Sequence, residues 1–110
     1  MLMDCTQKLR ELFGRSLPLF SALGDPIRQQ LIMLMMDGTQ RSVAELAAET
    51  ELARPTISHH LKILKTAHII TSRKDGTKIY YYPQMGAYFG PIKELVDTVG
   101  KLEKMKGIKY

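Results

Sequence analysis

Positive charge is concentrated in the central part of this chain of 110 residues. Residues 54–82 hold six basic side chains and one acidic one, that of Asp75, so this segment has a net charge of +5, whereas residues 1–53 and 83–110 carry −2 and +2. A basic block on an otherwise balanced protein indicates a polyanionic partner such as nucleic acid. The basic residues of the block are Arg54, Lys62, Lys65, Arg73, Lys74 and Lys78.

A helix predicted over about residues 53–67 crosses the first half of this block. Ile57, Leu61 and Leu64 recur at i, i+4 and i+7, so they are expected to face the core. The opposite face then carries small or polar groups, which can hydrogen-bond base edges or phosphates of DNA. The residues assigned to this DNA-facing surface are Thr56, Ser58, His59 and Lys62.

Two other residues of the same helix are assigned by their positions. Arg54 stands at its start, where unpaired backbone N–H groups also favour phosphate. His60 falls on the flank of the buried stripe, so it is predicted mainly to pack. Because His59 and His60 are adjacent on a helix, their rings point to different faces and do not form a metal pair.

The second half of the block predicts a β-hairpin. Residues 69–73 and 78–82 have the composition of strands, and Asp75-Gly76 between them is a strong turn signal. Arg73, Lys74 and Lys78 would then surround the tip, where basic side chains rest against the DNA backbone or reach into the minor groove. The tyrosines at 80–82 alternate faces and are predicted to pack the root of the hairpin, with one hydroxyl able to touch a phosphate.

No arrangement of side chains predicts catalysis, a metal site or a cofactor. The sequence shows no nucleophile–base pair, carboxylate dyad, phosphate loop or metal cluster, so we expect no enzyme. Cys5 cannot close a chelate alone and is predicted to be an inert apolar group, a redox or soft-metal sensor being the alternative. The methionines at 33, 35 and 36 are predicted to fill the core. With one cysteine, no signal peptide and no apolar run of ~18 residues, we expect a cytoplasmic protein without a membrane segment.

Capping signals mark the helices that must position these groups. A first helix is expected to end at Gly14, and a short second one, capped by Ser16, to end at Gly24. Asp25-Pro26 suits the start of a third helix, which buries a stripe at residues 27, 31, 34 and 35. Ser42 and Glu45 have the spacing of a capping box at the start of a fourth.

The end of the chain predicts a dimer interface. From Gly86 to about Lys106, apolar residues recur every three or four positions, which is too much apolar surface for a terminal helix facing water. We expect this helix to pack against the first helix and against the same helices of a second copy. The residues assigned to this seam are Leu2, Cys5, Leu9, Ile92, Leu95, Val96, Val99 and Leu102.

Together these elements predict a mainly α fold with a small β-hairpin. Two short helices joined by a turn and followed by a hairpin form a winged helix-turn-helix, whose second helix normally enters the major groove. We expect one domain over residues 1–110, a homodimer through the first and last helices, and double-stranded DNA as the partner. The alternatives are a protein-interaction module of the same fold and a non-specific chromosome-binding protein, which would share the salt sensitivity of binding but not the preference for one sequence.

Four motifs resemble the ArsR/SmtB family of bacterial repressors. They are Leu-Gly-Asp-Pro-Ile-Arg at 23–28, Val-Ala-Glu-Leu-Ala at 43–47, Thr-Ile-Ser-His-His-Leu-Lys-Ile-Leu-Lys at 56–65 and Arg-Lys-Asp-Gly-Thr-Lys at 73–78. The match covers roughly residues 16–83. The resemblance implies an obligate dimer built from the first and last helices. It also implies that the protein binds an operator and that a signal releases it from that DNA. It places base recognition at Thr56, Ser58, His59 and Lys62 and the wing around residues 73–78.

The chain departs from the family pattern at three places. Many members bind metal through a Cys-x-Cys pair, where this chain has Ser42 and Ala44. Others use histidines and acids of the last helix, where it has acids only. The resemblance therefore implies neither metal site and leaves the effector open. The family usually has glycine where His68 stands, a position at which histidine can adopt the left-handed conformation at some cost.

Overall fold

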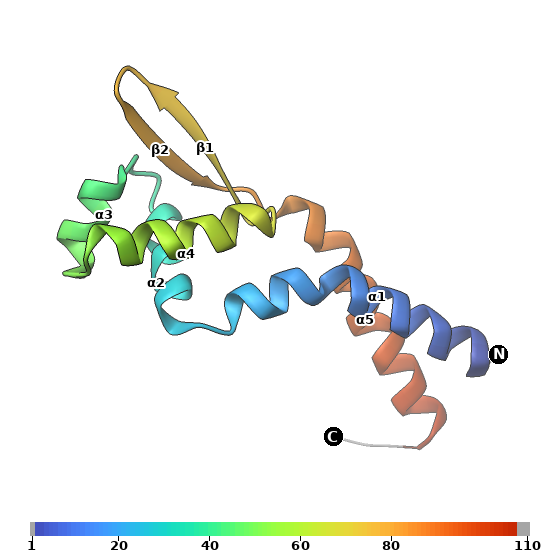
Figure 1. The fold of residues 1–110 in the computed structure, drawn as a ribbon. Helices are drawn as coiled ribbons and strands as arrows, with labels where there is room; N and C mark the ends of the chain where they lie inside the picture. The colour runs from blue at the N-terminus through green and yellow to red at the C-terminus, as the bar shows by residue number, and fades with distance from the viewer. Residues whose placement is uncertain (1, 108–110) are drawn as a thin grey trace. The chain divides into compact units, whose positions relative to one another are not determined.

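The computed structural model describes the backbone of residues 2–107 and the side chains of residues 5–107. Within this range the elements are α1 (Leu2–Leu23), α2 (Pro26–Met35), α3 (Val43–Thr50), α4 (Arg54–Thr66), β1 (Ile70–Asp75), β2 (Lys78–Pro83) and α5 (Gly86–Met105) (Figure 1). The predicted class, mainly α with one antiparallel hairpin, is confirmed. The chain divides into two compact units, one of α1 as far as Pro18 together with α5, the other of residues 19–85. A single domain over residues 1–110 stays a prediction.

The N-terminal helix is longer than expected. Gly14 was predicted to end it and Ser16 to cap a second one, but α1 continues through both residues and through Pro18 to Leu23. That prediction is wrong, because a glycine inside a helix costs only about 1 kcal/mol relative to alanine. Leu12 and Ser16, on either side of Gly14, are both buried. Burial of this face of the helix therefore outweighs the local signal.

In the first unit, an ion pair joins the two helices. Lys8 Nζ lies 2.5 Å from Glu94 Oε1, between α1 and α5. The hydrogen bond and charge of Glu94 raise the pKa of Lys8, and those of Lys8 lower the pKa of Glu94. Both groups therefore stay charged near neutral pH, and the pair supports the packing of the helices against each other.

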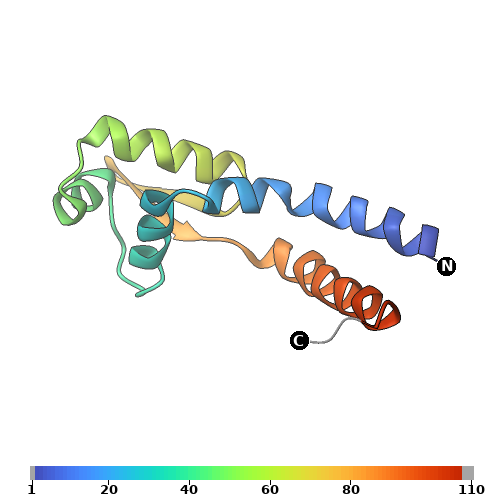
Figure 2. The ribbon, with the colours of Figure 1, turned by 90° about the horizontal axis from the view of Figure 1, so that it is seen from below.

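The core of the second unit forms where α2, α3, α4 and the hairpin meet. α4 contacts α2, α3 and β1, and α2 also contacts β2. The predicted stripe of Ile57, Leu61 and Leu64 is buried, which confirms the expected inner face of α4. α3 and α4 join through a short turn, with the hairpin beside α4 (Figures 1 and 2). The other side chains of this core with almost no exposed surface are Leu31, Leu46, Ile69 and Ile70.

The methionines of α2 differ from expectation. Met35 is buried, but Met33 and Met36 are 65% and 62% exposed, so the prediction that all three fill the core is wrong. Residues 33 and 36 lie on the side of α2 turned away from its buried stripe. Their positions around the helix axis, and not their apolar side chains, therefore decided that they are exposed.

The predicted caps set the start of α2 and α3. Asp25 accepts hydrogen bonds from the N–H groups of Ile27 (2.8 Å) and Arg28 (3.3 Å), with Pro26 in the first turn of the helix. Partial burial raises the pKa of Asp25, but these bonds and the charge of Arg28 outweigh it, so the pKa is lowered overall. At α3, Ser42 Oγ accepts from the N–H of Glu45 at 3.4 Å and donates to the Glu45 carboxylate at 3.1 Å.

A buried arginine connects α2 to α3. Arg41, in the loop between them, donates to both carboxylate oxygens of Asp37, at 2.8 and 2.6 Å, and also to the carbonyl of Leu34. Its Nε lies 2.6 Å from Glu49 Oε2 on α3. The hydrogen bond from Arg41 lowers the pKa of Asp37 strongly. This ion-pair cluster fixes where α3 begins after a loop with no regular structure.

The end of α4 is closed by His68 in the left-handed conformation, with φ of 59°. The N–H of His68 donates to the carbonyl of Lys65, and that of Ile69 donates to the carbonyl of Leu64, both at 3.0 Å. These two bonds form a Schellman motif, in which glycine is the residue usually found at the left-handed position. The motif turns the chain directly into β1, with Leu64 and Ile69 both buried.

The hairpin has the predicted place with a small shift in its turn. Pairing runs from Ile70↔Pro83 to Asp75↔Lys78, so Gly76 and Thr77 are the two turn residues, in place of the predicted Asp75-Gly76. Gly76 has φ of 63°, as the first central residue of a two-residue hairpin turn requires. Alternation then puts Arg73, Tyr80 and Tyr82 on one face of the hairpin. Ser72, Lys74, Ile79 and Tyr81 lie on the other.

We expect His68→Gly to raise the free energy of unfolding by roughly 0.5–1 kcal/mol, because glycine adopts the left-handed conformation without the Cβ penalty. Denaturant unfolding of the two proteins measures the difference. The matched control is Ala67→Gly, one residue earlier and outside the left-handed region, which should lower stability. A His68→Gly protein less stable than the parent would contradict this account of the turn.

We expect stability to depend on the Arg41–Asp37 pair in acid. The pKa of Asp37 is lower in the folded protein than in the unfolded chain, where it is about 3.9. The stability that the charged carboxylate adds is therefore complete above about pH 3.9 and is lost as the pH falls through the folded pKa. Asp37→Asn should therefore lower Tm at pH 7, and the difference from the parent should shrink below about pH 4. A Tm difference that stays constant from pH 7 to pH 2 would show that the charge of Asp37 is not involved.

Candidate nucleic-acid interface

The outward face of α4 carries the side chains assigned to DNA. Arg54, Ser58, His59 and Lys62 are exposed, and Thr56 is half-buried beside the core. The helix begins after Ala53 without a side-chain cap, and Pro55 lies in its first turn. Its first N–H groups are therefore left without a side-chain acceptor, and such groups attract anions. All five assigned side chains lie on this helix, and those of Arg54 and Thr56 are in its first turn, next to the uncapped end.

The inward face of α4 is anchored through His60, which is buried as predicted. Arg28 of α2 donates from Nη1 to His60 Nδ1 at 3.3 Å, and from Nε to the carbonyl of Ala22 at 2.6 Å. It also lies 3.8 Å from the carboxylate of Asp25. Since arginine only donates, Nδ1 of His60 is the acceptor in this contact. One guanidinium thus ties α4 to the end of α1 and the start of α2, and sequence reasoning assigned it no such role.

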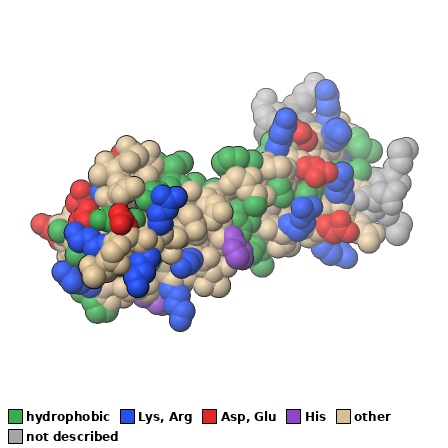
Figure 3. Space-filling model, turned by 90° about the horizontal axis from the view of Figure 1, so that it is seen from above, with side chains coloured by type: hydrophobic (Ala, Val, Ile, Leu, Met, Phe, Trp, Pro, Cys, Tyr) green, Lys and Arg blue, Asp and Glu red, His purple; other side chains and the backbone are tan. Residues whose placement is uncertain are grey.

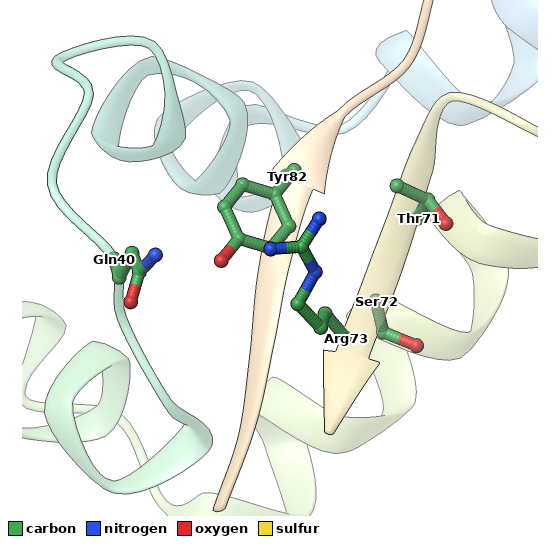
Figure 4. Close-up of a pocket in the computed structure, with 5 residues that line it drawn as sticks. All are labelled: Gln40, Thr71, Ser72, Arg73 and Tyr82. Carbon is green, nitrogen blue, oxygen red and sulfur yellow. The ribbon is translucent and has the colours of Figure 1, made fainter. Parts of the chain in front are cut away.

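The hairpin presents its three assigned basic residues in different settings. All three are exposed, but Arg73 lies with its guanidinium carbon 5.9 Å from the centre of the Tyr82 ring. These two side chains line a pocket of about 320 Å³ with Gln40, Thr71 and Ser72 (Figure 4). Lys78 lies 3.9 Å from Glu45 of α3. Lys74, on the opposite face from Arg73, has no ion pair within the described residues.

Charge on the second unit is distributed unevenly. In Figure 3, which looks onto the side of the hairpin, lysine and arginine side chains project from this unit at several points beside a few acidic ones. The acids at 25, 37 and 49 are paired with Arg28 and Arg41, whose side chains are largely buried. The basic residues of α4 are paired with no carboxylate among the described residues. The outward positive charge of α4 is therefore not neutralised within the chain.

The first unit exposes apolar side chains where the dimer seam was expected. Val96 is 65% exposed, Cys5, Leu9, Ile92, Val99 and Leu102 are half-buried, and the side chain of Leu2 lies outside the described residues. Leu95 is only 7% exposed, so it belongs mainly to the core of its own chain. The residues assigned to the dimer seam from the sequence do not include four further exposed apolar residues of these two helices. Their helical spacing could have identified them as seam residues. These are Phe13, Leu17, Phe89 and Met105.

Two features of the described residues concern metal binding and membrane insertion. No group of three or more histidine, cysteine or acidic side chains in residues 5–107 is arranged to hold a metal ion. Over the same residues, no helix has the length and apolar character needed to cross a membrane.

Comparison with known proteins identifies similar chains. The model of the family described as bacterial regulatory protein, arsR family, matches residues 25–72, from the start of α2 into β1. An uncharacterized HTH-type transcriptional regulator of Methanocaldococcus jannaschii is 35% identical over 92 residues, which cover 84% of this chain and 99% of that protein. The transcriptional repressor SdpR of Bacillus subtilis is 37% identical over 62 residues, covering 56% of this chain and 68% of the repressor.

A solved structure shows the same fold. It is the homodimeric winged helix-turn-helix DNA-binding domain of a possible ArsR-family regulator from Mycobacterium bovis, with a TM-score of 0.64 at 24% identity. The match covers 86% of this chain and 88% of that domain. α3 and α4 are therefore the two helices of a helix-turn-helix, and the β1–β2 hairpin is its wing.

Proposed function

This chain belongs to the ArsR family of bacterial regulatory proteins, and on that premise we propose that it represses transcription by binding an imperfect palindromic operator as a homodimer. The observation that carries the proposal is the outward face of α4, where exposed basic and small polar side chains have no carboxylate partner. Such a face suits the major groove, where hydrogen bonds to base edges specify sequence. The protein then acts where chromosomal DNA is, in the cytoplasm.

Each assigned residue has a distinct task in this proposal. Ser58, His59 and Lys62 reach base edges or flanking phosphates from the exposed face of α4, and Thr56 does so from its half-buried edge. Arg54 contacts phosphate at the uncapped helix end. The wing residues Arg73, Lys74 and Lys78 contact the backbone or the adjacent minor groove.

The dimer is proposed from the apolar face of the first unit. Phe13 and Leu17 share one face of α1, and Phe89 and Val96 share one face of α5; large apolar side chains such as these are unfavourable in water. A second copy would cover this face through a symmetric interface. Two copies present two α4 helices, so the operator has two half-sites about one helical turn, ~34 Å, apart. The relative from Mycobacterium bovis is described as homodimeric, which supports the proposal.

The test is the affinity of the purified protein for the DNA upstream of its own gene and for scrambled DNA, measured across a salt series. We expect a preference of ~10³-fold or more for its own sequence, and an affinity that falls steeply with salt as phosphates are neutralised. Equal affinity for both DNAs would favour the non-specific chromosome-binding alternative. No binding at low salt would favour the protein-interaction module.

Two lysine variants test the assigned surface in the same assay. Lys62→Ala should weaken operator binding about tenfold, because it removes a cation from the outward face of α4. Lys93→Ala, which changes another exposed lysine, on α5, is the matched control and should bind as the parent does. Equal affinity of Lys62→Ala and Lys93→Ala would contradict the assignment of the α4 surface.

Val96→Asp tests the dimer. Because Val96 is exposed within its own chain, the substitution should leave the monomer folded while placing two carboxylates in the proposed interface. We expect analytical ultracentrifugation to show monomers at concentrations at which the parent is a dimer. A stable dimer of Val96→Asp would refute the seam, and circular dichroism checks that the variant is folded.

A further inference from the structure

A small pocket lies between α4 and the wing. It has a volume of about 180 Å³ and is lined by Ser58, Leu61, Lys62, Lys65 and Tyr81. Four of these residues come from α4 and one from β2. Since a water molecule takes about 30 Å³ of liquid, the pocket has room for one phosphate group with bridging waters.

The polar groups of this pocket are suited to an anion. Lys62 and Lys65 bring two positive charges, and no carboxylate lines the pocket or pairs with either lysine in residues 5–107. Ser58 and Tyr81 add hydroxyl groups that can donate hydrogen bonds. Two ammonium groups without a counter-ion favour a negatively charged occupant.

The structure also holds Lys65 at the edge of this pocket. Its Nζ donates to Ser72 Oγ of β1 at 2.7 Å, so the ammonium group lies between α4 and the hairpin. The remaining two hydrogens of the ammonium group are free to bind an anion. Tyr81 is on the same hairpin face as Ser72, whereas Tyr80 and Tyr82 are on the opposite face.

The position of the pocket selects the source of the anion. A helix in the major groove and a wing in the adjacent minor groove lie on either side of one sugar–phosphate strand, which separates those grooves. That strand must therefore pass between α4 and the wing, over the pocket. Resting on the operator binding proposed above, we propose that the pocket holds one backbone phosphate in each half-site, with Lys65 and Tyr81 as DNA-contacting residues.

This role has a consequence for specificity. A phosphate has the same structure next to every base pair, so a contact to it positions the protein without reading the sequence. The pocket therefore sets the distance between α4 and the sugar–phosphate backbone. Loss of the contact weakens binding to every DNA sequence by a similar factor.

The experiment uses the full-length protein with Lys65→Gln and Tyr81→Phe, and Tyr80→Phe as the matched control on the other hairpin face. Lys65→Gln should lower affinity about tenfold for operator and scrambled DNA alike, and should reduce the slope of log K against log salt by about 0.9 per half-site. Tyr81→Phe should lower affinity roughly tenfold and leave the slope unchanged. Tyr80→Phe should bind as the parent does.

Neutral methylphosphonate, introduced one position at a time in the operator, identifies the phosphate. One position per half-site should weaken binding of the parent but have little further effect on Lys65→Gln. The inference is overturned if parental protein binds the operator while Lys65→Gln and Tyr81→Phe bind equally well, which leaves operator binding itself intact. Saturable binding of inorganic phosphate with no operator position coupled to Lys65 would overturn it in favour of a small-ligand site. If the parent does not bind DNA, operator binding and this inference both fail.

Discussion

Burial of one face of α4 is the constraint on which the rest of the structure depends. Ile57, His60, Leu61 and Leu64 face the core, against α2, α3 and β1. Because a helix has 3.6 residues per turn, burial of this face forces residues 58, 59 and 62 outward. Arg28 reinforces the same orientation through the ring of His60. The rotation of α4 about its own axis, and with it the surface that we propose to face DNA, is thus set from inside the protein.

The charges of the second unit are divided between structure and function. Asp25, Asp37 and Glu49 pair with Arg28 and Arg41, and these pairs join the helices to one another. The basic residues of α4 form no such pairs among the described residues, so their field extends outward. A net charge alone does not distinguish these two groups of cations. Their distinction depends on which carboxylates the fold brings within reach.

Local signals in the sequence were sufficient for most helix boundaries and for the functional class. Asp25-Pro26 and Ser42 with Glu45 act within a single turn of helix, so their capping roles follow from spacing alone. The stripe at 57, 61 and 64 depends only on helical periodicity, and it correctly separated the inner from the outer face of α4. The resemblance to the family, which usually has glycine at this position, indicated that His68 could adopt the left-handed conformation, and its φ is 59°.

Features that depend on residues far apart in the sequence were decided by the tertiary structure. Gly14 lies inside α1 because buried neighbours hold the helix together, and Met33 and Met36 are exposed because α2 packs through another face. The contacts of Arg28 with His60 and of Lys65 with Ser72 join residues 32 and 7 positions apart, from different elements. The sequence by itself thus determined most elements, their caps and the inner and outer faces of α4, since these depend on neighbours within a turn or two. The anchors of that helix and the pocket beside it required the fold, because only packing brings their groups within hydrogen-bond distance.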